Sequence, residues 1–347
     1  MSEEAVRAAF ASQVHWCTTL GSPLTARLTK LLGERLDRST AVGRRVLDWP
    51  GDPAPEGDNV PARMCGAFHF LVRTGEAPGL AALYPPAPLP SEATLWAALE
   101  PLLAARQEVL DSFLDSAPQT NEVGRSAGLM AGLIAVSDRF ALPLRLFELG
   151  SSAGLNLNLD RYGHRLGGRS AGVADSPLRL APLWRGPPPP DAPVRILGRS
   201  GVDLSPRDPA AESERLLAFV WADQRERLAR MEAALSIAAA HPPGVEQGDA
   251  AEWLERVLPA AAAEGAVRVV MHSLAFQYFP SETQQRITRL MERLGAGADE
   301  ERPLAWLSYE QLRGEERASL RLRLWPDGEE RLLGFAHPHG RYVEWLG

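Results

Sequence analysis

The stretch Leu144–Asp160, LRLFELGSSAGLNLNLD, predicts the fold of this chain. Its first six residues are mostly apolar and follow Pro143, a length typical of a buried strand in a parallel sheet. Five small residues, Gly150–Gly154, come next, and leucines then alternate with polar residues. A strand, a small-residue turn and a helix in this order place a ligand against free backbone N–H groups. Glu148, at the carboxyl end of the strand, indicates a site rather than core packing.

The composition is that of a globular protein with 347 residues, 45% of them hydrophobic and 23% charged. This length allows one large domain with an appendage, or two domains. The net charge of −7 argues against general nucleic-acid binding, which requires a basic field. Cys17 and Cys65 are too few for a disulfide scaffold, which favours a reducing compartment. With no signal-peptide pattern and no run near the roughly 20 apolar residues of a membrane span, we expect a cytoplasmic protein without a membrane partner.

The chain changes character near residue 140. Residues 1–140 are predicted to be mostly helical, and residues 141–347 alternate predicted strands and helices. Residues 161–193 are rich in Arg, Gly and Pro and include GPPPPDAP, a pattern that favours an extended insertion. We therefore predict an N-terminal helical region that covers the substrate, followed by a Rossmann-like domain.

A predicted helix at 119–139 directly precedes the central strand. Thr120 or Asn121 is expected to cap it. Three glycines at four-residue spacing predict a smooth face on which another element packs closely: Gly124, Gly128 and Gly132.

Three further predicted strands each end beside a polar side chain. They are Val194–Leu197, followed at some distance by Asp203; Val245–Gln247, followed by Asp249; and Ala266–Met271, followed by His272. At the C-terminus, apolar alternation around Pro326-Asp-Gly328 predicts an antiparallel hairpin, with a last strand near Tyr342–Trp345. The predicted architecture is a doubly wound α/β sheet with an antiparallel C-terminal edge.

Several motifs resemble those of class I S-adenosylmethionine-dependent methyltransferases. Glu148-x-Gly150-x-Ser152-x-Gly154 resembles their E/D-x-G-x-G-x-G loop, with serine in place of the middle glycine. Gly201-Val-Asp203-Leu-Ser205-Pro206 looks like the G-x-D-x-S-P context at the end of their second strand. Gln247-Gly-Asp249-Ala250 resembles the segment after their third strand. The resemblance covers about residues 140–347.

This resemblance implies an S-adenosylmethionine cofactor and a small-molecule methyl acceptor. It implies that Asp203 holds the ribose hydroxyls and that Asp249 lies near the adenine. The implied cofactor-binding residues are Glu148, Gly150, Ser151, Ser152, Ala153, Gly154, Asp203, Leu204, Asp249 and Ala250.

The candidate catalytic residues are His272, Tyr278, Glu122 and Arg125. His272 ends the fourth predicted strand, which in this fold faces the transferred methyl group, and a neutral imidazole is available as a base near neutral pH. Tyr278 follows and can orient an acceptor. Glu122 and Arg125 precede the central strand; either they border the substrate pocket or they cap their own helix.

Two alternatives stay open within this reading. Asp203 lies 55 residues after Glu148, against roughly 20 in a compact βαβ unit. Either the insertion at 161–193 accounts for the distance, or the second strand lies at Tyr162–Leu166.

A different function is a serine hydrolase, because Gly150-Ser-Ser152-Ala-Gly154 also matches the G-x-S-x-G nucleophile elbow. The chain order of Ser152, then Asp203 or Asp249, then His272, His337 or His339 satisfies a triad. No HGGG-type oxyanion segment precedes the elbow. A third function is a non-catalytic cofactor-binding or regulatory module.

The whole chain also resembles a bacterial family, domain of unknown function 2332, whose members share phrases like QTNEVGRSA, ELGSSAGLN and AHPHG. This resemblance implies no activity. His337-x-His339 has too few ligands for a metal site, so we expect none. The sequence names neither the methyl acceptor nor the oligomeric state.

Overall fold

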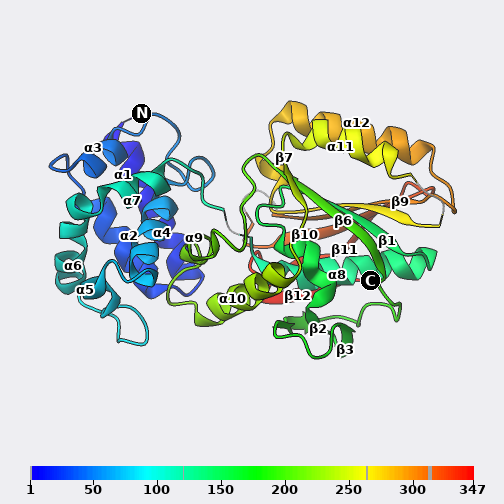
Figure 1. The fold of residues 1–347 in the computed structure, drawn as a ribbon, viewed down its shortest axis with the longest axis horizontal. Helices are drawn as coiled ribbons and strands as arrows, with labels where there is room; N and C mark the ends of the chain where they lie inside the picture. Colours follow the sequence, from blue (N-terminus) through cyan, green and yellow to red (C-terminus); the bar gives the residue numbers. More distant parts are fainter. Residues whose placement is uncertain (1, 120, 263–264, 312–314) are drawn as a thin grey trace. The chain divides into compact units, whose positions relative to one another are not determined.

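The computed structural model describes residues 2–119, 121–262, 265–311 and 315–347. The chain forms two compact units (Figure 1). The helical unit consists of Met1–Thr120 and Glu212–Ala229, and the sheet unit consists of Asn121–Ala211 and Arg230–Gly347. The compact units therefore divide 20 residues before the predicted boundary at residue 140, because the helix that ends at Phe140 packs on the sheet. That residues 1–140 cover a substrate stays a prediction.

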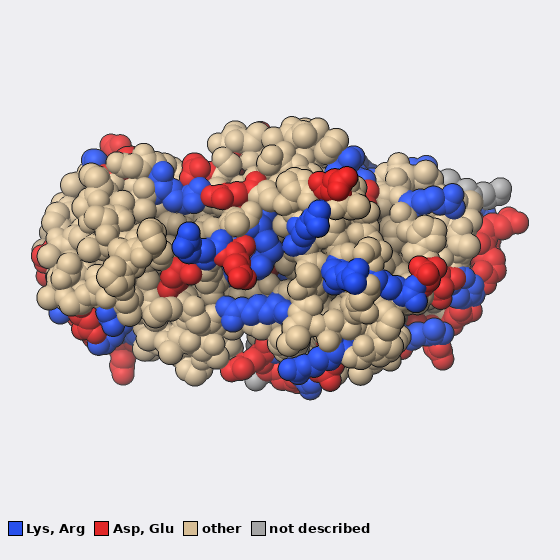
Figure 2. All heavy atoms as spheres, turned by 90° about the horizontal axis from the view of Figure 1, so that it is seen from below, with Lys and Arg blue, Asp and Glu red and all other residues tan. Residues whose placement is uncertain are grey.

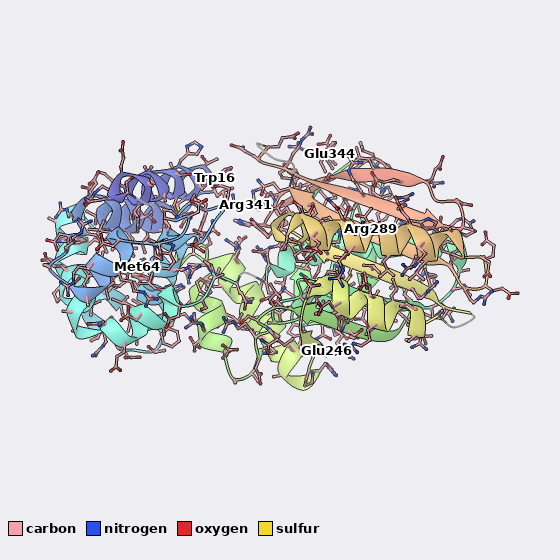
Figure 3. All side chains as sticks on the ribbon, turned by 90° about the horizontal axis from the view of Figure 1, so that it is seen from above. Trp16, Met64, Glu246, Arg289, Arg341 and Glu344 are labelled. Atoms are coloured by element: carbon pink, nitrogen blue, oxygen red, sulfur yellow. The ribbon has the colours of Figure 1, made fainter. Side chains whose placement is uncertain are left out.

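The helical unit packs short helices around an apolar core that includes Leu31, Met64 and Phe68 (Figure 3 labels Met64). Its helices are α1 (Glu3–Thr19), α2 (Pro23–Arg35), α3 (Ala41–Leu47), α4 (Val60–Arg73), α5 (Pro78–Ala81), α6 (Glu92–Ala105), α7 (Gln107–Leu114) and α9 (Ser213–Ala218), with the first residues of α10 (Arg225–Ala240).

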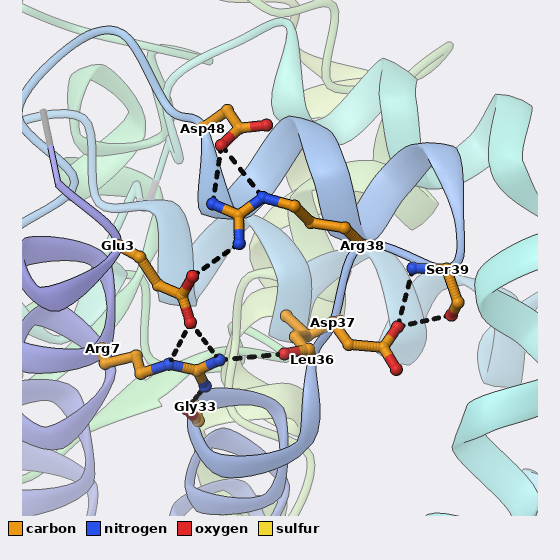
Figure 4. Close-up of polar contacts among 8 residues, drawn as sticks. All are labelled: Glu3, Arg7, Gly33, Leu36, Asp37, Arg38, Ser39 and Asp48. Carbon is orange, nitrogen blue, oxygen red and sulfur yellow. Dashed lines mark hydrogen bonds and ion pairs between the residues drawn. The ribbon is translucent and has the colours of Figure 1, made fainter.

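Polar contacts join the ends of these helices. Arg38 bridges Glu3 at the start of α1 and Asp48 at the end of α3, with N···O distances of 2.6 and 2.8 Å (Figure 4). Asp223 accepts a hydrogen bond from the Leu24 N–H at 2.8 Å and so caps α2 from 199 residues away. Ala218 and Phe219 also belong to the apolar core of this unit, so residues 212–229 pack with the first 119 through both contacts.

The sheet unit contains a nine-stranded sheet in the order β5-β12-β11-β10-β9-β8-β1-β6-β7. The strands are β1 (Leu144–Leu149), β5 (Leu183–Arg185), β6 (Ile196–Asp203), β7 (Val245–Gln247), β8 (Val267–Ser273), β9 (Leu304–Gln311), β10 (Ala318–Trp325), β11 (Glu330–Ala336) and β12 (Tyr342–Trp345). Strands β7, β6, β1, β8 and β9 are parallel, and β9 to β12 are antiparallel neighbours. The predicted α/β class, doubly wound order and antiparallel C-terminal edge are confirmed.

Helices cover both faces of this sheet (Figure 1). Helices α11 (Ala250–Ala260) and α12 (Ser281–Ala296) pack with Phe147 and Leu149 of β1 in one apolar cluster. Because side chains alternate along a strand, Leu146 and Glu148 face the other side, where α8 (Ser126–Phe140) lies against β9 and β10.

The glycine face of α8 permits a close approach to β9. A Cβ at Gly128 would lie 2.8 Å from the Tyr309 ring, and one at Gly132 would lie 2.5 Å from Leu307. The predicted close packing of this face is confirmed. The predicted helix at 119–139 starts instead as a 3₁₀ turn, η1 (Val123–Arg125), that leads into α8, and Thr120 lies outside the described residues.

The second strand of the doubly wound order is β6, which ends at Asp203 beside β1. It starts two residues after the predicted Val194 and extends six residues beyond the predicted end at Leu197, to Asp203 itself. The alternative position at Tyr162–Leu166 is wrong. There, β2 (Gly163–Leu166) pairs with β3 (Arg169–Gly172) and β4 (Arg179–Leu180) in a separate three-stranded sheet within the insertion.

In the described part of the chain, no helix combines the length and the apolar character needed to cross a membrane. Both acidic and basic side chains occur across the face shown in Figure 2.

Candidate functional site

Glu148 is a buried carboxyl group near the carboxyl end of β1. It is 2% exposed. Burial raises its pKa to about 8, although the nearby charge of Arg125 and the side chain of Asn156 lower it in part. A carboxyl group held this far from water indicates a site, because such groups are otherwise excluded from protein interiors.

The loop after β1 is tightly folded. Gly150, Ser152 and Gly154 all have positive φ, of 67°, 54° and 68°. The N–H groups of Gly150 and Ser151 donate to the Val202 carbonyl of β6 at 2.9 and 3.0 Å. The serine in place of the predicted middle glycine therefore adopts a glycine-like conformation, and the loop closes over the end of β6.

Packing explains why the loop needs its two glycines. A Cβ at Gly150 would lie 2.6 Å from the Ala275 side chain, which follows β8. A Cβ at Gly154 would lie 2.7 Å from Pro243 and Val245, where β7 begins. The loop is thus enclosed by segments that adjoin β7 and β8. After it, η2 (Leu155–Arg161) is a 3₁₀ helix in place of the expected α-helix.

Asp203 joins the second predicted motif to the loop. Its Oδ2 accepts a hydrogen bond from the Ser152 N–H at 2.8 Å, and its Oδ1 accepts one from Ser205 at 2.9 Å. Gly201 allows this contact, since a Cβ there would lie 2.2 Å from the Ser151 hydroxyl. Two motifs that are about 50 residues apart thus meet at one edge of the sheet. Leu204 follows with its side chain 68% exposed.

The third motif has a local structural role. Asp249 caps α11, because its Oδ1 accepts hydrogen bonds from the N–H groups of Ala251 and Glu252 at 2.9 and 3.0 Å. Its Oδ2 accepts the Thr283 hydroxyl at 3.2 Å. Asp249 follows β7 as predicted, and Ala250 behind it is buried. The nearness of either residue to an adenine stays a prediction.

Three segments far apart in the sequence meet beside β1. Asn121 Oδ1 accepts the Leu155 N–H at 2.8 Å, and the Ser126 hydroxyl donates to Asn156 Oδ1 at 2.7 Å. A Cβ on Gly124 would lie 2.6 Å from the carbonyl oxygen of His339. Residues 121–126, the segment from Leu155 to Asn156 and His339 therefore meet in one cluster, in which Ser126 and Asn156 are residues that sequence reasoning missed.

Arg125 ties this cluster to β8. Its Nη1 donates to the Ser273 carbonyl at 2.5 Å and to the Ser273 hydroxyl at 3.1 Å, and its Nε donates to the Pro338 carbonyl at 3.2 Å. Glu122 accepts the Gly124 N–H at 3.0 Å and caps η1. Both predicted residues are 6% exposed, and the local capping role is present for Glu122.

His272 does not offer a free ring nitrogen. Its Nε2 is 2.9 Å from the indole Nε1 of Trp306, and an indole N–H only donates. Nδ1 must then carry the proton, which it donates to Glu310 Oε1 at 2.7 Å. In this arrangement His272 cannot take a proton from a substrate. Tyr278, on η3 (Phe276–Tyr278), is 62% exposed, so the structure does not place it in the buried cluster.

Three buried polar atoms on and beside the loop have no hydrogen-bond partner in the described part of the chain. They are Glu148 Oε2, the Ser152 hydroxyl and Asn156 Nδ2, although the Asn156 side chain lies close enough to Glu148 to lower its pKa. Buried polar groups are normally paired, so an unpaired set indicates a missing partner such as a ligand or a water. The set offers an acceptor, a hydroxyl and a donor. Its only sequence signal was the unusual alternation of Asn with Leu after the loop.

Within the described residues, Ser152 has no histidine partner. His272 is held by Glu310 and Trp306, and His337 Nδ1 accepts the His339 N–H at 2.9 Å. The triad that the hydrolase hypothesis requires is therefore not assembled here. The described part of the chain also contains no group of three or more His, Cys, Asp or Glu side chains placed to hold a metal ion.

The fold is a doubly wound α/β sheet with a tight glycine loop after β1, next to the point between β1 and β8 where the strand order reverses. The chain belongs to the family described as uncharacterized protein conserved in bacteria (DUF2332), whose model matches residues 7–345. No curated protein matches the chain.

Proposed function

We propose that this protein binds S-adenosylmethionine at the loop after β1 and transfers its methyl group to a small molecule. One observation carries the proposal: the Asp203 carboxylate at the end of β6 accepts the Ser152 N–H of the loop at 2.8 Å. The loop acid and the second-strand acid that the resemblance requires thus lie at one sheet edge. The order β7-β6-β1-β8-β9 supports the same site, because doubly wound sheets bind ligands where the order reverses.

The residues present suit this cofactor chemically. Each carboxylate oxygen accepts more than one hydrogen bond, so Asp203 can hold ribose hydroxyls while it holds Ser152. Leu204 offers an exposed apolar side chain next to it for a base. The unpaired Oε2 of Glu148 accepts a donor, and a cationic ammonium group would favour its charged form. The cofactor supplies an activated methyl group, so the protein mainly aligns and encloses the reactants.

The test is calorimetry with S-adenosylhomocysteine on wild type, Asp203→Ala and a matched control, Asp175→Ala. Asp175 is exposed and lies in the insertion. Loss of hydrogen bonds to a charged group at Asp203 should weaken binding about 10- to 100-fold. The control should bind as wild type does. Equal affinity in Asp203→Ala would remove β6 from the site, and no binding by wild type would end the proposal.

A second candidate function is a cofactor-binding module without catalysis. It is favoured by His272, whose two ring nitrogens are both engaged, so the predicted base is not available. The two functions differ in turnover. Release of S-adenosylhomocysteine from S-adenosylmethionine in the presence of small-molecule acceptors supports the enzyme, whereas tight binding without release supports the module.

A further inference from the structure

The two carboxylate oxygens of Glu310, near the end of β9, differ in their hydrogen bonds. Its Oε1 accepts three donors: His272 Nδ1–H at 2.7 Å and the N–H groups of Ala275 and Phe276, each at 3.1 Å. Its Oε2 is buried and has no hydrogen-bond partner in the described part of the chain. Because one oxygen is held by three donors, the direction of the other oxygen is set by the structure.

The charge of Glu310 is not matched by a basic side chain. Among the described residues its only ion-pair partner is His272, which is neutral when Trp306 donates to its Nε2. Burial raises the pKa of Glu310, whereas the hydrogen bond from His272, the charge that His272 carries when protonated, and the N–H groups of Ala275 and Phe276 lower it below its usual value. Three donors on Oε1 favour the carboxylate form of Glu310, and Oε2 has no donor among the described residues.

Aromatic rings pack on His272, the residue that donates to this carboxylate. Phe276 stacks on His272 with ring centroids 4.8 Å apart, and its ring meets Trp306 edge-on at 5.8 Å and Phe279 at 5.7 Å. Phe276, Phe279 and Trp306 are only partly buried. Aromatic faces next to a carboxylate are typical of sites that recognise a cationic nitrogen.

The Glu310 group adjoins the loop of the proposed cofactor site. Ala275, whose N–H binds Glu310, is the residue whose side chain packs on Gly150. A ligand held by Glu310 would therefore lie near the carboxyl ends of β1 and β8, where the strand order reverses.

From these contacts we propose that Glu310, with Phe276 and Trp306, binds a cationic nitrogen, and that the methyl acceptor of this protein is an amine. His272 is then a positioning residue that holds Oε1, and Oε2 receives an N–H of the amine. The binding of a cationic nitrogen stands by itself; its role as the acceptor subsite rests on the proposed methyl transfer.

The experiment is an NMR titration of the ¹⁵N-labelled full chain with butylammonium, followed at the Ala275 and Phe276 amides. Butan-1-ol is the neutral control ligand. Glu310→Gln keeps an amide oxygen in place of Oε1 but removes the charge, and Glu344→Gln, on β12, is the matched control (Glu344 is labelled in Figure 3). Phe276→Leu removes one aromatic face and serves as a second variant should Glu310→Gln fail to fold.

We expect a butylammonium dissociation constant of about 1–10 mM, as suits so small a ligand. Glu310→Gln should weaken it at least 10-fold, Phe276→Leu about 3-fold, and Glu344→Gln not at all, and wild type should bind butan-1-ol at least about 10-fold more weakly than butylammonium. If the Ala275 and Phe276 amide signals of wild type do not shift at about 20 mM butylammonium, the proposal is overturned. It is also overturned if Glu310→Gln and Phe276→Leu both bind butylammonium as tightly as wild type does. A parallel titration with S-adenosylhomocysteine tests the proposed function separately, because it does not depend on the amine.

Discussion

The two compact units differ in whether their buried polar side chains have hydrogen-bond partners. In the helical unit, Arg63 donates to the carbonyls of Asp58 and Leu114 at 2.6 and 2.7 Å, and His69 Nδ1 lies 3.2 Å from the Ala218 carbonyl. Among the described residues, the buried side-chain atoms without a partner all belong to the sheet unit. Of these, Glu148 and Glu310 lie near the ends of β1 and β9, Ser152 lies in the loop after β1, and Asn156 lies in η2.

This difference agrees with the proposed site in the sheet unit. A cavity of about 20 Å³ in the helical unit, lined by Gln13, Thr25, Cys65, His69 and Tyr84 among others, is large enough for one water. The helical unit is therefore packed for stability, whereas the sheet unit leaves polar groups that a ligand would complete.

The largest effect is expected in the helical core. Phe68 is fully buried on α4, so Phe68→Ala should lower the free energy of unfolding by about 3–5 kcal/mol through lost burial and a cavity. Chemical denaturation measures the change, with Phe68→Leu as the milder control. A loss below about 1 kcal/mol would contradict the tight packing that separates this unit from the other.

Glu148 should make stability depend on pH in the sheet unit. Its pKa is raised to about 8 in the folded protein, so the folded state binds the proton more tightly than the unfolded state. The sign follows: the contribution is fully present below the unfolded value of 4.5 and is lost as pH rises through about 8.

Glu148→Gln removes this pH-dependent contribution to stability, because glutamine does not ionise. The difference in unfolding free energy between variant and wild type should grow in favour of the variant between pH 5 and pH 9, by on the order of a few kcal/mol. Denaturation curves at several pH values test it. If the difference in unfolding free energy does not change with pH, Glu148 is ionised over this whole range and its pKa is not raised in the folded protein.

Alanine substitutions at two glycines with positive φ distinguish the cost of backbone strain from the cost of steric crowding. A Cβ at Gly154 would lie 2.7 Å from Pro243, whereas a Cβ at Gly168, with φ of 94°, meets nothing within 4 Å. Gly168→Ala should cost only about 1 kcal/mol of backbone strain, and Gly154→Ala about 1–3 kcal/mol more. Thermal denaturation compares them; equal losses would mean that Pro243 yields and the loop is not tightly enclosed.

The smallest effect is expected at Ser152. Ser152→Gly suits its φ of 54° and should change stability by no more than about 1 kcal/mol. Because no histidine contacts Ser152 in the described residues, a fluorophosphonate probe should leave it unlabelled. Intact mass spectrometry that finds an adduct on Ser152 would revive the hydrolase hypothesis against the proposed function.

Much of the site could be predicted because local patterns carry it. The apolar run Leu144–Leu149 forms β1 as predicted, and the two glycines of the loop have the positive φ that their residue type allows. Asp203 was placed at the end of the second strand by its motif, despite a separation of 55 residues from Glu148.

Other parts of the site depend on neighbours that no sequence pattern specifies. The sequence predicts that His272 is a base, but its hydrogen bonds to Trp306 and Glu310 decide its role. These two residues lie beside His272 because β8 pairs with β9. Ser126 and Asn156 are joined across 30 residues in the same way. Periodicity determines which face of an element is buried, but the partners of a buried polar group depend on strand register and helix packing.

By itself, the sequence determined the central strand, the glycine loop, the doubly wound class with its antiparallel edge, and the acids at the strand ends, because each depends on residue type and spacing along a few positions. Only the tertiary structure decided which polar groups are satisfied. Hydrogen bonds to His272, Asp249 and Glu310 come from residues far along the chain or from the ends of other elements, and the atoms left unpaired on Glu148 and Glu310 follow from that same packing.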